Sequence, residues 1–96
     1  MRDAITLYEQ TLAAQEQQLG NTHPHTLATR SNLANAYQAD GRLAEAILLY
    51  EHTLTAQEQQ LGSTHPHTLA TRNNLANAYQ AAGRLEDARK ILRRIA

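Results

Sequence analysis

The sequence predicts an all-α protein built as a stack of about five helices arranged in antiparallel pairs. One stretch, from Thr22 to Leu43, returns 42 residues later as Thr64 to Leu85 with two differences. A fixed period of this size is typical of repeat arrays, in which each unit buries its apolar face against its neighbours. The apolar residues are mainly leucine and alanine, and valine, phenylalanine and tryptophan are absent. This composition favours helices over strands.

The composition also limits the classes of function. The 96 residues carry a formal net charge of zero, which gives no electrostatic support for binding nucleic acid or an anionic membrane. There is no cysteine, and therefore no disulfide framework and no thiolate metal site. No secretory segment and no long apolar run is present. We expect a soluble, cytoplasmic protein with no cofactor and with neither nucleic acid nor a membrane as its partner.

The first helix is predicted at residues 1–19, which match residues 43–61 under the same 42-residue shift. The chain is therefore expected to begin in the second half of a repeat. In the complete copy one apolar stripe has helical spacing: Leu43, Ala46, Ile47, Tyr50, Leu54 and Leu61. Leu49 lies off this stripe and predicts a second contact face, as in a helix sandwiched inside a stack.

Two helices of a second kind are predicted at residues 24–40 and 66–82. Each follows a glycine that ends the preceding helix and a His-Pro pair, in which proline suits the first helical position. The residue before proline avoids helical dihedral angles, so each histidine is the expected N-cap. The predicted inner faces are Leu27, Leu33, Ala34 and Tyr37, repeated as Leu69, Leu75, Ala76 and Tyr79.

The last helix is predicted at residues 85–95, with its apolar stripe at Leu85, Ala88, Leu92 and Ile95. Basic residues stand on its other side: Arg89 and Lys90 replace Ile47 and Leu48, and Arg93 and Arg94 replace Glu51 and His52. Terminal repeats need a polar outer face, so this helix is expected to cap the stack. We divide the single domain into half a repeat at 1–21, a full repeat at 22–63, and a repeat with a shortened, charged capping helix at 64–96.

A set of residues at fixed spacing connects the chain to a known family: Leu33, Ala34, Tyr37, Gly41, Leu43, Ala46, Tyr50 and Leu54, then Leu75, Ala76, Tyr79, Gly83, Leu85 and Ala88. This pattern resembles the tetratricopeptide repeat (TPR), and the 42-residue length resembles the repeats of kinesin light chains and of sensor arrays attached to bacterial signalling NTPases. An aromatic residue of the usual pattern is replaced by Arg30 and Arg72, and the closing proline is missing. The resemblance implies a right-handed superhelix that binds proteins or peptides. No nucleotide-binding motif accompanies the repeats, so NTPase activity is not implied.

The resemblance also suggests where a partner binds. In family members the first helix of each repeat lines a concave groove, and asparagines there hold the backbone of an extended peptide. The matching amides are Asn32, Asn35, Gln38, Asn74, Asn77 and Gln80. An alternative is that these amides pair with neighbouring helix ends or face water. Arg30 and Arg72 could pair with an acidic group of a ligand, or with glutamates inside the stack. A clamp for a terminal carboxylate is not expected, because Ser31 and Asn73 stand where it needs lysine.

The histidines invite a metal hypothesis, which we set below the capping role. His23 and His25, like His65 and His67, flank a proline instead of sharing a helix face, and no carboxylate is close in sequence. No set of nucleophile, base and orienting group recurs either, so no catalytic residue is assigned and the protein is expected not to be an enzyme.

Two hypotheses of function follow. The first is a protein-interaction module that binds a peptide or protein in the groove. The second is a self-assembling, engineered or duplicated structural repeat without a dedicated ligand, since Tyr8–Leu43 and Tyr50–Leu85 differ at only five of 36 positions. In either case the first helix is expected to leave an apolar face open and to form a homodimer or a higher homo-oligomer. The residues predicted for this contact are Ile5, Leu7, Tyr8 and Leu12.

Overall fold

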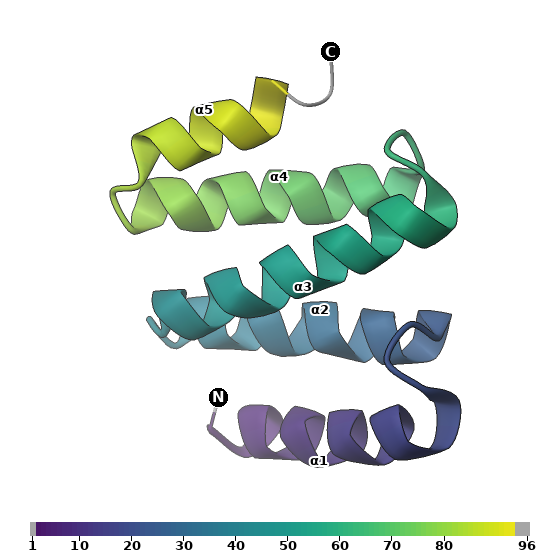
Figure 1. Ribbon diagram of the computed structural model, residues 1–96. Coiled ribbons are helices and arrows are strands. Elements are labelled where there is room, and N and C mark those ends of the chain that lie inside the picture. The colour runs from purple at the N-terminus through teal and green to yellow at the C-terminus, as the bar shows by residue number, and fades with distance from the viewer. Residues whose placement is uncertain (1, 94–96) are drawn as a thin grey trace.

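The computed structural model describes residues 2–93, and this part of the chain forms five α-helices and no strand. The helices are α1 (Arg2–Leu19), α2 (Pro24–Ala39), α3 (Leu43–Leu61), α4 (Pro66–Ala81) and α5 (Leu85–Arg93) (Figure 1). The all-α prediction is therefore confirmed. The helices predicted to end at 40 and 82 end one residue earlier, because Asp40 and Ala82 are their C-caps. The predicted positions Arg94 and Ile95 lie outside the described residues.

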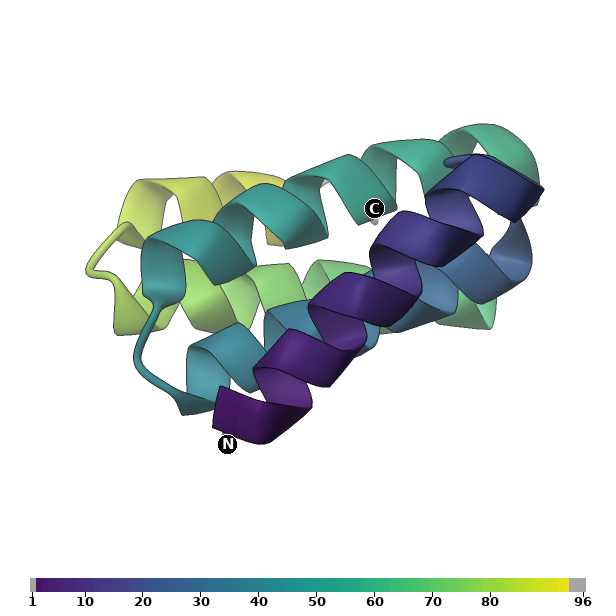
Figure 2. The same cartoon turned by 90° about the horizontal axis from the view of Figure 1, so that it is seen from below.

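The helices form a solenoid in which each one packs mainly against its neighbours in sequence. Figure 1 shows them stacked in chain order from α1 to α5. Seen from below in Figure 2, α2 and α4 lie in one layer, α3 and α5 lie in another, and α1 crosses the stack diagonally. The second-layer helices therefore bridge successive first-layer helices, and α2 and α4 come to lie alongside each other across α3.

Helix α3 has the two covered faces that its sequence predicts. Ala46, Ile47, Tyr50 and Leu54 are buried in the core, and Leu49 packs against that core from a second side. Leu61 was predicted to share the buried stripe, but it is 37% exposed. It is the last residue of α3, where the covering helices no longer enclose the side chain.

Helix α5 departs from its predicted stripe. Ala88 and Ile91 are buried, whereas Leu85 and Leu92 are exposed. The reason is that α5 packs mainly on one helix, α4, so only one of its faces is well covered. Ile91 stands where α3 has Leu49, on the side that faces the preceding helix of the same repeat.

The His-Pro connections start α2 and α4 as predicted. His23 has extended backbone dihedral angles, and its Nδ1 accepts a hydrogen bond of 3.1 Å from the His25 N–H. His65 does the same for α4, again at 3.1 Å from the His67 N–H. Each cap satisfies one of the free N–H groups at a helix start. The N-cap prediction for both histidines is confirmed.

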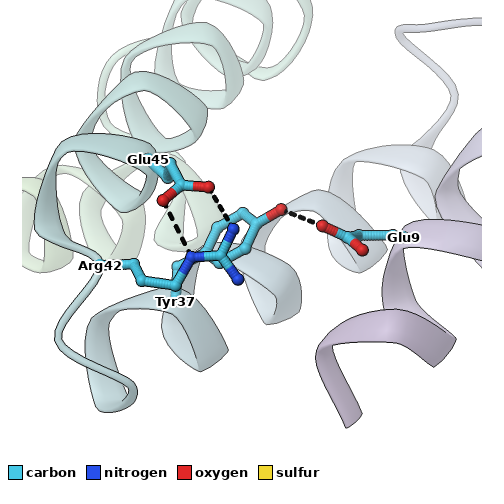
Figure 3. A network of polar contacts seen from close by, with 4 residues as sticks. All are labelled: Glu9, Tyr37, Arg42 and Glu45. Carbon is cyan, nitrogen blue, oxygen red and sulfur yellow. Dashed lines mark hydrogen bonds and ion pairs between the residues drawn. The ribbon is translucent and has the colours of Figure 1, made fainter. Parts of the chain in front are cut away.

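A polar cluster at the α2–α3 turn ties three consecutive helices together (Figure 3). The Tyr37 hydroxyl of α2 donates to Glu9 of α1 at 2.5 Å, and the Arg42 guanidinium lies 4.4 Å from the centre of the Tyr37 ring. Arg42 also pairs with Glu45 of α3, and this hydrogen bond raises the pKa of Arg42 and lowers the pKa of Glu45. Burial and the Glu9 hydrogen bond raise the pKa of Tyr37 to about 12.

The same cluster recurs one repeat later. Tyr79 of α4 donates to Glu51 of α3 at 2.5 Å, and Arg84 lies over the Tyr79 ring at 4.6 Å while pairing with Asp87 of α5. Burial and the hydrogen bond to Glu51 raise the pKa of Tyr79 to about 12. We call these two sets the tyrosine clusters; each links the end of one repeat to the next and fixes how the repeats are stacked.

Candidate functional site

A hollow of about 220 Å³ separates α2 from α4 where the two first-layer helices lie alongside each other. Its residues come from both helices and from the buried side of α3: Ala28, Ser31, Asn32, Gln57, His67, Ala70, Thr71 and Asn74. We call this hollow the inter-repeat groove. Asn32 and Asn74, which occupy the same position in successive repeats, are therefore brought to one groove.

A second hollow of about 210 Å³ continues from the groove, with which it shares Ala28, Gln57 and His67. The other lining residues are Pro24, Leu27, Gln60, Leu61 and His65, so its surface is mostly carbon and includes no carboxylate. We call it the apolar end of the groove. It lies where α2 and α4 begin and α3 ends.

Two of the predicted groove amides have a partner inside the stack. The hydroxyl of Tyr50 donates a hydrogen bond to Oδ1 of Asn35 and lies within hydrogen-bond distance, 3.1 Å, of Oε1 of Gln38. Burial raises the pKa of Tyr50 to about 12, so this hydroxyl remains a donor at neutral pH. For these two residues the structure shows the alternative of pairing within the stack, and they hold α2 to α3.

Their counterparts Asn77 and Gln80 are exposed on α4 and make no side-chain hydrogen bond within the described part of the chain. The cause is one substitution between repeats. Where α3 has Tyr50, α5 has Leu92, which carries no hydroxyl. These two amides face solvent, outside the residues that line the groove.

The arginines also lie inside the stack. Arg30 is buried and its Nη2 lies 3.1 Å from Glu16 of α1. Arg72 is 0% exposed and its Nη2 lies 3.0 Å from Glu58 of α3. For both arginines the structure shows the alternative of pairing with glutamates inside the stack. Neither arginine lines the groove.

The face predicted for self-association is only partly open. Ile5 and Leu12 are buried in the core where α1 packs on α2, so their expected exposure is wrong. Tyr8 is partly buried, and Leu7 is 63% exposed. The stripe that contains Ile5 and Leu12 packs on α2, which follows α1 in the chain, so the open face of α1 is narrower than the sequence predicts.

The sequence reasoning missed Gln57, which lines both hollows. A signal was present, because Gln57 lies three residues after Leu54 and four before Leu61 on the apolar stripe of α3. A polar side chain on a buried helix face is costly unless it meets a partner. The histidine pairs form no metal centre: within residues 2–93 no group of three or more His, Cys, Asp or Glu side chains could hold a metal ion. No helix in that part is long and apolar enough to cross a membrane.

Comparison with known proteins agrees with this architecture. A tetratricopeptide-repeat family model matches residues 1–59 and 28–95. Among curated proteins, the kinesin light chain-related protein 3 of Arabidopsis thaliana is 46% identical over 43 residues, which are 45% of this chain and 7% of that protein. Among solved structures, the nearly identical TPR-like repeats of a kinesin light chain-type protein from Podosopora anserina are 40% identical, with a TM-score of 0.92 over 98% of this chain and 44% of that one. The Q17M form of the same repeats matches at 38% identity and a TM-score of 0.92.

The chain thus spans less than half the length of these relatives. The family model covers nearly every residue, and the repeats have the length and helix order of the kinesin light chain type. The chain belongs to the tetratricopeptide-repeat family.

Proposed function

We propose that this TPR module binds an extended segment of a protein or peptide in the inter-repeat groove, with Asn32 and Asn74 as the contacts to the ligand backbone. The observation that carries the proposal is the meeting of these two equivalent amides in one hollow between α2 and α4. A carboxamide offers both a donor and an acceptor, as a peptide unit does. Two such groups in register suit a ligand that runs along the groove.

The charge distribution around the groove favours binding of a neutral peptide backbone over binding of a charged group. Arg30 and Arg72 are committed to glutamates, and the groove itself is lined by amides, small side chains and His67. A ligand anion would find no free arginine or lysine among these lining residues. No catalytic constellation supports an enzymatic function, and the cytoplasmic location stays a prediction.

A selection of random dodecapeptides on the wild-type protein tests this function. The selected peptides should bind the double variant Asn32→Ala/Asn74→Ala at least tenfold more weakly. The matched control is Asn77→Ala/Gln80→Ala, which removes two exposed amides of α4 outside the groove. Equal binding by both variants, or a failure to select any peptide, would contradict the groove function.

A second candidate, self-association through α1, is supported by comparing the two copies of the same helix. Leu49 packs against the core and Thr53 is fully buried in α3, whereas their counterparts Leu7 and Thr11 on α1 are exposed. An apolar face covered in one copy and open in the other is a surface on which a further helix fits. We infer that a second copy of the chain covers it, giving a homodimer.

The solution mass over a roughly hundredfold concentration range measures this association. We expect a dimer that Leu7→Glu converts to a monomer. Leu48→Glu is the matched control, because Leu48 is an exposed leucine on another helix, α3. A wild-type protein that stays monomeric at the highest concentration would exclude the dimer.

A further inference from the structure

The Gln57 side chain is buried without using its acceptor. The residue is 5% exposed, and its Oε1 accepts no hydrogen bond within the described part of the chain. A buried amide oxygen without a partner loses its hydration and gains nothing in return. Gln57 lines both the inter-repeat groove and its apolar end. The residue that carries the unused acceptor therefore contributes to the lining of two hollows that a ligand can enter.

The apolar end has the size and lining of a pocket for one side chain. Its volume is about 210 Å³, and Pro24, Leu27, Ala28 and Leu61 supply most of its carbon surface. An apolar cavity of about 150 Å³ is already large enough to hold benzene. A leucine or methionine side chain thus fits, and it would cover Leu61, which is partly exposed.

We propose that the apolar end of the groove anchors one aliphatic side chain of a bound peptide, of leucine or methionine size, while a backbone N–H of that peptide is donated to Oε1 of Gln57. This inference rests on the proposed function, since it assigns a side-chain preference and a specificity residue to the same groove. The donor is a neutral amide, because an ammonium group would enter a hollow whose lining holds no carboxylate to neutralise it.

The chain contains a matched control for Gln57. Gln15 holds the equivalent position on α1, and its Oε1 is likewise buried without a hydrogen-bond partner within residues 2–93. Helix α1 packs mainly on α2, whereas α3 packs extensively on both α2 and α4. Gln15 thus shares the unpaired acceptor with Gln57 but lacks the two-sided surroundings that form the pocket.

Titration of the ¹⁵N-labelled protein with N-acetyl-leucine N-methylamide tests the anchor site without knowledge of the natural ligand. A ligand of this size is expected to reach a dissociation constant on the order of 1 mM. The shifts should be centred on the Gln57 side-chain amide and on the backbone of Leu27 and Leu61. The alanine analogue, and the leucine analogue with every amide nitrogen methylated, should bind at least fivefold more weakly.

Two variants then test whether Gln57 is the residue that accepts the hydrogen bond from the ligand. Gln57→Leu should bring the leucine amide and its methylated analogue to equal affinity, whereas Gln15→Leu should leave their fivefold difference intact. The anchor site is excluded if the wild-type protein shows no saturable shift at Gln57, or if alanine and methylated analogues bind as well as the leucine amide. These wild-type comparisons do not depend on the folding of either variant.

The result is separable from that of the groove function. Loss of peptide binding in Asn32→Ala/Asn74→Ala, together with no preference for leucine amide, would support peptide binding in the groove and reject the anchor site. A preference for leucine amide, with no dodecapeptide selected, would support the anchor site and reject peptide binding in the groove.

Discussion

The side chains of Arg30 and Arg72 show how one residue type serves the stack where the family pattern has an aromatic residue. Each lies on a first-layer helix and reaches back to a glutamate on the helix before it, Glu16 or Glu58. Arg72 also donates to the backbone carbonyl of Ser63 at 3.3 Å. The long aliphatic stem fills the core space, and the charged end finds a carboxylate at its edge.

Glu58→Gln should lower the free energy of unfolding by about 3 kcal/mol, because it leaves the buried charge of Arg72 without its counter-ion. Glu16→Gln is the matched control, expected to cost about 1 kcal/mol or less, since the Glu16 side chain is 37% exposed against 17% for Glu58. Urea unfolding followed by circular dichroism measures both variants. Equal losses would show that burial does not set the strength of these pairs.

The tyrosines predict a loss of stability in alkali. The pKa values of Tyr37, Tyr50 and Tyr79 are raised from 10.0 to about 12, so folding favours the neutral phenols. This contribution is complete below pH 10 and is lost as the pH rises through about 12. Lys90 is the one lysine in the sequence, so tyrosines dominate proton release in this window.

Urea midpoints measured between pH 9 and pH 12 should therefore fall most steeply above pH 10. The variant Tyr37→Phe/Tyr79→Phe should show a shallower fall, although its stability at pH 7 is lower because two hydrogen bonds are lost. An unchanged slope in this variant would contradict the role of the tyrosine clusters.

At the scale of the helix, the two His-Pro connections decide where α2 and α4 begin. His65→Ala removes the side-chain acceptor of the cap and should destabilise the protein by about 1 kcal/mol. His67→Ala is the control, because His67 contributes its backbone N–H to this bond, and that group is kept. The rings of His65 and His67 also meet edge to face, with their centres 5.1 Å apart. Thermal unfolding compares the two variants; a larger loss in His67→Ala would mean that this ring contact contributes more to stability than the cap.

The helix ends also show the use of glycine in the connections. Gly62 follows α3 with φ of +91°, a backbone conformation that other residues adopt only with strain. It turns the chain so that Ser63, Thr64 and His65 can reach the start of α4. The same residue stands at position 20, one repeat earlier, where it also has φ of +91°.

For the whole molecule, the linear order of contacts predicts unequal stability along the chain. Helix α3 is covered on two sides, whereas α1 and α5 each pack mainly on one helix. In such an array stability is close to a sum over neighbouring contacts. Native-state hydrogen exchange should therefore show the strongest protection in α3 and the weakest in α1 and α5. Ile47→Ala should reduce protection throughout, since it removes a side chain from the centre; uniform protection in the wild-type protein would contradict this picture.

The family, the helices and most of the core follow from local patterns of sequence. The 42-residue period, the His-Pro starts and the stripe of α3 depend on residues close together in the chain. The candidate site was only partly predictable. Asn32 and Asn74 meet in the groove, but Asn35 and Gln38 are drawn to Tyr50, and their equivalents Asn77 and Gln80 are not. A repeat pattern predicts the same role for equivalent positions in each repeat. The side chains that surround those positions nevertheless differ from one repeat to the next.

The sequence by itself determined that this chain is a TPR solenoid with capped helices, because periodicity and chain stereochemistry act locally. Only the tertiary structure decided that Ile5 and Leu12 are covered, that the arginines face glutamates, and that Gln57 lies unpaired at the groove. The physical reason is that burial and hydrogen bonding depend on which side chains a neighbouring helix brings within reach. That neighbour is set by the stacking of whole helices, which no single stretch of sequence specifies.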